Sequence, residues 1–357
     1  MGAMKYGDEG MDAPPRLEQD HSSVVMASKL DLRYPADGPT RQLTFNLGPL
    51  ASLNFPIALV TAIWRAKSAS AIFVSIPRPG EFLLMSLIKA VYGERITTFV
   101  FDLVMREPGS VRERIVARIK RRLLRSVDVF IFIHRDTSGY ERVYGISREK
   151  CVYIPFKANN FDLAQSIAPG DDGYALSLGT SQRDYDLLFD AVRDLPIQLK
   201  IVAPKARVST HGARMGLAEL PINVERIDRP VDRTEWNFLI ARSRFVVIPI
   251  LPGVLQPAGI SVYLEAMILG KPVIITRGAS TEQILDGSLA VLVPPGDREA
   301  LRTAIVRLWS DPGLRATLSE NGKKYAQSLG NNDRLLADLR SIIKQKCGST
   351  TSRHPRR

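Results

Sequence analysis

Short apolar runs alternate along this chain with longer segments whose apolar residues recur at helical spacing. In the first half, runs typical of strands buried on both faces of a parallel sheet lie at 71–76, 96–101 and 128–133. Segments with helical spacing lie at 50–66, 81–91 and 110–127. The second half repeats this alternation, with predicted strands at 174–178, 198–202, 224–227 and 245–249. The pattern therefore predicts an α/β protein with two parallel sheets.

The polar and irregular segments divide the chain. Residues 1–21 are rich in Gly, Pro, Asp and Glu, so we expect a disordered tail there. Residues 22–156 form the predicted first domain and 173–330 the second, joined by a linker at 157–172 that lacks apolar periodicity. A last helix is predicted at 331–346, and the polar, basic end at 347–357 is predicted to be a disordered tail.

An uncharged stretch from 42 to 64 is long enough to cross a bilayer. Polar residues and helix breakers interrupt it, namely Asn46, Gly48, Pro49, Asn54 and Pro56. We therefore expect a buried helix here in preference to a membrane span.

The segment 259–297 contains the clearest local chemistry. Gly259 precedes a helix that Gly270 and Pro272 end, and Val273 to Ile275 follow as a buried strand. The unpaired amides at the start of this helix favour an anion. Glu265, on its second turn, is suited to accept hydrogen bonds from sugar hydroxyls.

Four short motifs in this segment carry a family resemblance: Glu-Ala-Met at 265–267, Gly-Lys-Pro-Val-Ile at 270–274, Gly-x-x-x-Glu at 278–282 and Pro-Gly-Asp at 295–297. In this order they resemble the nucleotide-sugar site of GT-B glycosyltransferases, in particular retaining family 4 (group 1). The resemblance implies two Rossmann-like domains facing a cleft, with the helix at 331–346 crossing back to the first. It also implies a donor nucleotide-sugar, retention at the anomeric carbon, and a departing phosphate that helps to deprotonate the acceptor.

The resemblance assigns donor-binding roles to residues at strand ends and at the start of the helix after Gly259. Arg183 stands near the place of the family's cations and is the candidate for the diphosphate; a local salt bridge to Asp186 is the alternative. Thr180 replaces a usual arginine, and Lys205 is the candidate second cation. The predicted donor-binding set is Gly179, Arg183, Lys205, Asp228, Gln256, Gly259, Ile260, Ser261 and Glu265.

The first domain departs further from the family pattern. Asp102 and His134 follow predicted strands and are the candidate catalytic residues, with a turn or cap role for Asp102 and a structural role for His134 as alternatives. The family's Gly-Gly loop is missing, so the N-terminal domain is abbreviated or the chain start is truncated or divergent. Gln256 or Pro257 stands where the family has the first of two glutamates, which removes a charge near the donor sugar.

Charge adds a second kind of partner. Lys and Arg number 49 against 37 Asp and Glu, a net charge of +12 that calls for an acidic partner. One helix concentrates cations beside an apolar arc, and an anionic membrane surface would suit them as well as a solvated face would: Arg114, Arg118, Arg121, Arg122 and Arg125. No aromatic stacking set accompanies them, which argues against nucleic acid.

Cys151 and Cys347 are too few for a disulfide framework, which fits a reducing cytoplasm. We expect no metal site and no cofactor, because no cluster of His, Asp and Glu has metal-ligand spacing. The predicted function is a metal-independent transfer of sugar to a lipid-linked or polysaccharide acceptor, in the cytoplasm or peripherally on the inner face of the cell membrane. The alternatives are a non-catalytic GT-B-like partner subunit, a nucleotide-sugar 2-epimerase, or a phosphorylase. Oligomeric state is left open.

Overall fold

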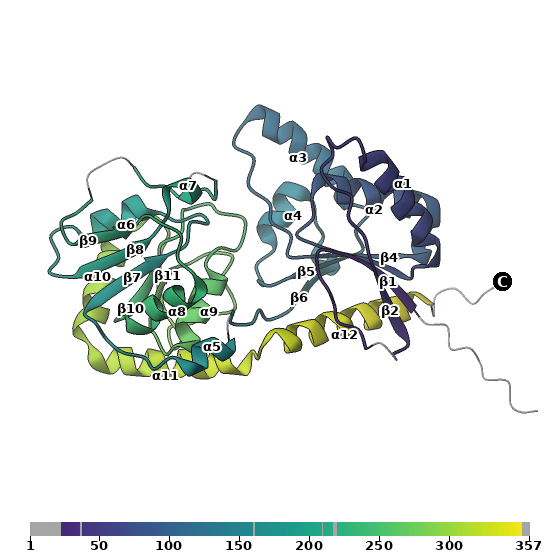
Figure 1. Ribbon diagram of the computed structural model, residues 1–357. Coiled ribbons are helices and arrows are strands. Elements are labelled where there is room, and N and C mark those ends of the chain that lie inside the picture. Colours follow the sequence, from purple (N-terminus) through teal and green to yellow (C-terminus); the bar gives the residue numbers. More distant parts are fainter. Residues whose placement is uncertain (1–22, 36–37, 160, 209, 217–219, 352–357) are drawn as a thin grey trace, which may run out of the picture.

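The computed structural model describes residues 23–351 apart from 36–37, 160, 209 and 217–219, and it holds two α/β domains side by side (Figure 1). The predicted tail at 1–21 lies outside the described residues. Each domain is built on a parallel sheet of six strands. The predicted α/β class with two Rossmann-like domains is thereby confirmed.

The N-terminal sheet has the strand order β2-β1-β3-β4-β5-β6. Its strands are β1 (Ser23–Ser28), β2 (Thr40–Thr44), β3 (Ala71–Ser75), β4 (Thr97–Phe101), β5 (Val129–Phe132) and β6 (Cys151–Tyr153). Its helices are α1 (Phe55–Arg65), α2 (Pro79–Tyr92), α3 (Val111–Leu124) and α4 (Ser138–Tyr144), with short 3-10 turns η1 (Ala66–Ser68), η2 (Gly93–Arg95) and η3 (Arg148–Lys150).

The C-terminal sheet has the order β12-β11-β10-β7-β8-β9, the arrangement of a doubly wound nucleotide-binding fold. Its strands are β7 (Tyr174–Leu178), β8 (Gln198–Val202), β9 (Val224–Ile227), β10 (Phe245–Ile248), β11 (Val273–Thr276) and β12 (Val291–Val293). Its helices are α5 (Phe161–Ser166), α6 (Tyr185–Val192), α7 (Lys205–Val208), α8 (Arg233–Arg242), α9 (Ile260–Ile268), α10 (Arg298–Ser310) and α11 (Pro312–Ser328).

Alternation along the central strands explains why the apolar runs are continuous. In β3, Phe73 packs into the core below the sheet and Ile72 and Val74 into the core under α1 to α4, so both faces are buried. The same holds in the second domain, where Val246 and Val247 belong to different clusters. A strand covered on both sides needs no polar positions, which produces the signal seen in the sequence.

The last helix, α12 (Asn332–Thr351), runs from the C-terminal domain along the underside of the N-terminal sheet (Figure 1). Leu336, Leu339 and Ile343 are buried there, and the Arg340 guanidinium donates to the carbonyl of Leu32 at 2.6 Å. This helix extends to Thr351, whereas the sequence predicted its end at 346 and a disordered tail from 347.

The helix predicted within 42–64 is not buried, which corrects the sequence interpretation. β2 takes the first part of the stretch, and α1 follows after a loop. Phe55 and Ala62 of α1 face the core, but Ile57, Val60 and Trp64 are 69%, 66% and 63% exposed. None of the helices in the described part of the chain has the length and apolar character that a bilayer crossing requires.

Candidate functional site

The candidate site lies where the order of the C-terminal sheet reverses, between β7 and β10. Gly179 ends β7 with φ +90°, a conformation that suits glycine. The segment after it is tied to the loop after β10, because the Asp184 amide donates to Pro249 and the Leu251 amide to Gln182, both at 3.0 Å. The two loops therefore form one rim at the carboxyl edge of the sheet, the usual ligand position in such folds.

Helix α9 begins at this rim. Gly259 is its N-cap with φ +93°, and no side chain caps the first turn, which also carries no acidic residue. A Cβ on Gly259 would lie 2.9 Å from Cγ2 of Ile248, so glycine lets the helix start close against β10. The amides of the first turn, including those of Ile260 and Ser261, have no partner within the helix and favour an anion above them.

Glu265 lies one turn further along α9, on the same side as Ser261. It is buried, and the indole Nε1 of Trp236 donates to its carboxylate at 2.7 Å. Burial raises the pKa of Glu265, and hydrogen bonds from Trp236 and Asn159 oppose that rise. The cavity beside Glu265 has a volume of about 470 Å³. Its lining residues are Lys157, Asn159, Val231, Asp232, Arg233, Trp236, Ser261, Glu265 and Asn332.

Lys205 and Asp228, both predicted to bind the donor, lie together at the ends of β8 and β9. The Lys205 amide donates to the Asp228 carboxylate at 2.6 Å, and its ammonium lies 3.6 Å from the other carboxylate oxygen. The hydrogen bond from the Lys205 amide is the largest cause of the lowered pKa of Asp228. The pair brings one exposed cation and one carboxylate to the edge of the sheet beyond Gly179.

Arg183 departs from its predicted orientation. Its side chain is 1% exposed, and it donates to the carbonyls of Leu178 at 3.2 Å and Ser181 at 2.8 Å beneath the Gly179 turn. Burial lowers the pKa of Arg183 to about 10, so it stays charged at neutral pH. The fork predicted to face a diphosphate is therefore turned into the loop. The alternative salt bridge to Asp186 is not formed either, because Arg214 pairs with Asp186 and, at 2.5 Å, with Asp184.

Gln256 lies in a second, smaller cavity of about 260 Å³ between the domains. It is buried, and its side-chain oxygen has no hydrogen-bond partner among the described residues. The cavity is lined from the N-terminal domain by Asp136, Ser138, Gly139 and Arg142, and from the C-terminal domain by residues of the loops after β10 and β11, among them Gln256, Arg277 and Ser280. The Gln256 amide and the Ser280 hydroxyl are both suited to form hydrogen bonds with sugar hydroxyls.

The two domains touch at this cavity. Leu255 belongs to the apolar cluster of the N-terminal domain, and a Cβ on Gly139 of α4 would lie 2.2 Å from its Cδ1. Glycine at 139 therefore leaves the space that Leu255 fills. The loop that carries Gln256 is positioned by a residue of the other domain.

Asp102 and His134 lie at the ends of neighbouring strands, β4 and β5, on the side of Tyr140. Asp102 has φ +54°, and desolvation raises its pKa from 3.8 to about 6. His134 is only 1% exposed, packs 4.9 Å from the Phe132 ring, and neither ring nitrogen has a hydrogen-bond partner in the described part of the chain. Burial lowers its pKa to about 4. The sequence placed His134 in the cleft lining, and the structure instead closes it off.

The raised pKa of Asp102 makes a pH-dependent contribution to stability. An acid whose folded pKa is higher than its unfolded pKa binds more protons when folded, so its contribution to stability falls as pH rises from about 4 to about 6. A rise of this size corresponds to roughly 3 kcal/mol at most. Relative to wild type, Asp102→Asn should gain stability between pH 4 and 7, by about 2 kcal/mol, in urea unfolding at both pH values. A difference that is constant with pH would contradict the raised pKa.

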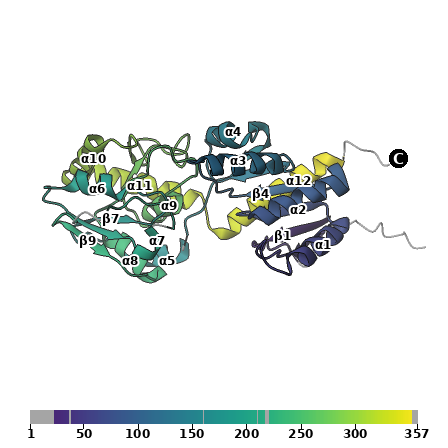
Figure 2. The same ribbon diagram turned by 90° about the horizontal axis from the view of Figure 1, so that it is seen from above.

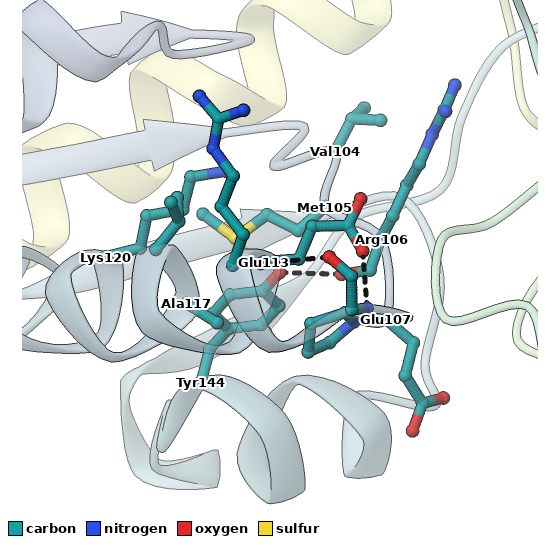
Figure 3. A pocket seen from close by; sticks show the side chains of 12 residues that line it. Val104, Met105, Arg106, Glu107, Glu113, Ala117, Lys120 and Tyr144 are labelled. Atoms are coloured by element: carbon teal, nitrogen blue, oxygen red, sulfur yellow. Dashed lines mark hydrogen bonds between the residues drawn. The ribbon is translucent and has the colours of Figure 1, made fainter.

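The cavity of about 640 Å³ lies in the N-terminal domain between the 104–108 loop and α3 (Figure 3). Glu113 and Tyr144 hold the loop: the Glu113 carboxylate accepts from the amides of Gly109 and Ser110 at 2.7 and 3.0 Å, and the Tyr144 hydroxyl donates to the Arg106 carbonyl at 2.6 Å. The remaining lining mixes apolar groups with the cations Arg106, Arg112 and Lys120 and the carboxylate of Glu107.

Several residues of these cavities were not identified from the sequence. Trp236 carried no motif, although it holds Glu265, and Lys157 and Asn159 fell in the predicted linker. Leu255 and Gly139 carried no motif. Their roles arise from contacts between positions far apart in the chain, which leave no local sign in the sequence.

Comparison with known proteins places the C-terminal domain. Residues 178–311 match the family model "Glycosyl transferases group 1". An uncharacterised glycosyltransferase of Methanocaldococcus jannaschii is 25% identical over 164 residues, which are 44% of this chain and 44% of that relative. The match therefore spans less than half the length of the relative.

Solved structures extend the likeness to the whole fold. A glycosyltransferase from Rickettsia africae has a TM-score of 0.62 at 12% identity, covering 91% of this chain and 98% of its own. Sucrose-phosphate synthase from Thermosynechococcus elongatus has a TM-score of 0.63 at 17% identity, covering 92% and 90%. HepE of Anabaena in complex with UDP has a TM-score of 0.63 at 15% identity, covering 92% and 100%. The chain therefore has the GT-B fold, and its residues 178–311 match the group 1 glycosyltransferase family.

Proposed function

We propose that this protein transfers a sugar from a nucleotide-sugar donor to a lipid-linked or polysaccharide acceptor, with retention at the anomeric carbon and without a metal. The observation that carries the proposal is the pairing, on α9, of an uncapped N-terminus with the buried carboxylate of Glu265. The first favours a phosphate and the second favours hydroxyls, which are the two ends of a nucleoside diphosphate.

The donor fits this edge in one direction. With the diphosphate over the amides of Ile260 and Ser261, the nucleoside lies toward Glu265 and the 470 Å³ cavity, and the sugar toward Gln256 and the interdomain cavity. Lys157 and Arg233 line the nucleoside cavity, while Arg277 lines the sugar cavity. UDP is the nucleotide bound in the HepE structure, so a uridine donor is the first to test.

The chemical role of the site is to stabilise the leaving diphosphate. The α9 amides are fixed donors aimed at the charge that develops as the sugar leaves, and Lys205 is an exposed cation at the same edge of the sheet. Arg183 acts indirectly, by holding the Gly179 turn. Gln256 supplies a hydrogen-bonding amide but no charge, so it orients the sugar and does not stabilise a developing cation.

The acceptor enters from the N-terminal domain. Asp102 is the better candidate of the two predicted catalytic residues, because it is half-buried where His134 is enclosed, and a pKa near 6 leaves it mostly ionised at neutral pH and able to orient a hydroxyl. His134 is assigned a packing role beside Phe132 and Tyr140. We assign an anionic part of the acceptor to the cavity beside α3, where three cations outnumber the carboxylates of Glu107 and Glu113.

The decisive test is calorimetric binding of UDP, GDP, ADP and CDP, each in EDTA and with magnesium. One nucleotide should bind equally well in both conditions. Glu265→Gln should weaken its binding about tenfold or more, because a charge-assisted hydrogen bond to a ribose hydroxyl becomes a neutral one. With the matching sugar nucleotide, NMR of the product should show the anomeric configuration of the donor.

Glu225→Gln is the matched control, since Glu225 is an exposed carboxylate on β9 whose ion pair among the described residues is with Lys200, at 3.2 Å. It should bind the nucleotide as wild type does. If none of the four nucleotides binds, the catalytic proposal fails and a non-catalytic partner subunit becomes the leading account.

A further inference from the structure

Helices α1, α2 and α3 lie side by side as one layer over the N-terminal sheet, on the side away from α12 (Figures 1 and 2). The outer side of this layer has an unusual composition. On α3, Val111, Ile115 and Ile119 are 68%, 52% and 58% exposed. They recur every four residues, opposite the buried Ala117 and Leu124, so they form one outward stripe.

Helix α1 repeats the arrangement at the edge of the layer. Its exposed Ile57, Val60 and Trp64 lie opposite Phe55 and Ala62, and Leu53 just before the helix is 95% exposed. Val91, at the end of α2, is 61% exposed. The exposed apolar side chains of α1 and of α3 thus each lie opposite the face that their helix buries, on the outer side of the layer.

Cations accompany the apolar stripe and carboxylates do not. The sequence of α3 contains Arg112, Arg114, Arg118, Lys120, Arg121 and Arg122, and Arg125 follows at its C-cap. Its single carboxylate, Glu113, is engaged in capping the helix. On α1 there is no acidic residue, and Lys67 lies 4.5 Å above the Trp64 ring. The exposed surface of these helices therefore combines apolar side chains with positive charges.

We infer that the outer face of α1 and α3 docks on an anionic lipid bilayer, with the apolar side chains in the interface and the arginines on the headgroups. The charge excludes the other occupants: a second copy would bring like charges together, and a nucleic acid would leave the apolar stripe unpaired. That the acceptor is lipid-linked, with its anionic head in the cavity beside α3, rests on the proposed function. The inference of a docking surface does not depend on the proposed function.

The geometry connects the two. Arg112, Val116 and Lys120 line the 640 Å³ cavity from the same helix that bears the stripe. The cavity also reaches Arg106, whose guanidinium donates to the Thr210 carbonyl of the other domain at 3.4 Å. A lipid held in the bilayer would place its head between the membrane surface and the interdomain cleft.

The test is flotation with vesicles of phosphatidylcholine alone and with added phosphatidylglycerol, at low and high salt. Wild type should float only with the anionic vesicles, and high salt should weaken binding. Ile115→Asp with Ile119→Asp should reduce binding at least tenfold, and Arg118→Gln with Arg122→Gln by about tenfold. Val306→Asp with Arg307→Gln, an exposed apolar and basic pair on α10, is the matched control and should float normally.

Trp64 gives a second readout. Its emission should shift to the blue on anionic vesicles and be quenched by brominated lipid, and Trp64→Phe should remove that response. Equal flotation with neutral vesicles, an equal loss in the α10 control, or concentration-dependent dimers through α3 without lipid would each overturn the proposal. So would an oligonucleotide complex weakened by the arginine changes but not by the aspartates. Nucleotide binding by the same variants should be unchanged, which separates this test from that of the donor site.

Discussion

Gly139→Leu is expected to reduce the rate of transfer about 100-fold while leaving nucleotide binding within about threefold of wild type. A Cβ at 139 would already lie 2.2 Å from Cδ1 of Leu255, so a leucine must push the loop after β10 away from α4. That loop carries Gln256, and the donor sugar would be misplaced relative to the acceptor. The nucleoside part of the site, around Glu265, does not touch α4. Steady-state kinetics and calorimetry on the same preparations check both parts.

Two controls accompany this variant. Gly287→Leu adds the same side chain where a Cβ meets nothing within 4 Å, and it should leave the rate unchanged. Combining Gly139→Leu with Leu255→Ala exchanges the large side chain across the interface and should recover part of the rate. An unchanged rate in Gly139→Leu alone would mean that the contact between the domains has no part in the reaction.

Arg183→Ala is expected to lower the free energy of unfolding by about 3–4 kcal/mol, because it leaves a cavity and two unpaired carbonyls. Arg183→Met fills most of that space and should cost only about 1–2 kcal/mol, since a buried charge is itself expensive to desolvate. Urea unfolding monitored by far-UV circular dichroism measures both. Arg334→Ala, an exposed arginine paired with Asp338 on α12, should change stability by less than about 0.5 kcal/mol.

The methionine variant also decides what Arg183 does. If Arg183 supports the Gly179 turn mainly by filling the space beneath it, Arg183→Met should bind the nucleotide within about threefold of wild type. A loss of tenfold or more in a stably folded protein would instead return Arg183 to the diphosphate, by a rearrangement of the 180–184 loop.

The sequence predicts the framework well where its signals are local. Continuous apolar runs identify central strands, because both faces of those strands are covered, and the motifs from Gly259 to Asp297 predict the edge where we propose that the donor binds. The same locality explains the errors. Whether an arginine after a strand points outward or into its own loop depends on the partner loop after β10, which the sequence of 179–184 does not contain.

The exposed face of α1 shows the converse limit. An uncharged stretch predicts that a helix is buried, but the sequence does not show which part of the protein covers it. The structure supplies Phe55 and Ala62 to the core and leaves Trp64 and Ile57 outside. Pairings across long separations, such as Trp236 with Glu265 or Gly139 with Leu255, likewise have no local signature.

The chain passes between the domains twice, once between β6 and β7 and again where α11 gives way to α12. Two connecting segments form a hinge: the domains can rotate about the line that joins the two segments, and rotation about other axes is restricted. Lys157 and Asn159 belong to the first segment and Asn332 to the second, and all three line the cavity beside Glu265. A nucleoside in this cavity would contact both connecting segments at once, so binding of the donor would set the angle between the two domains.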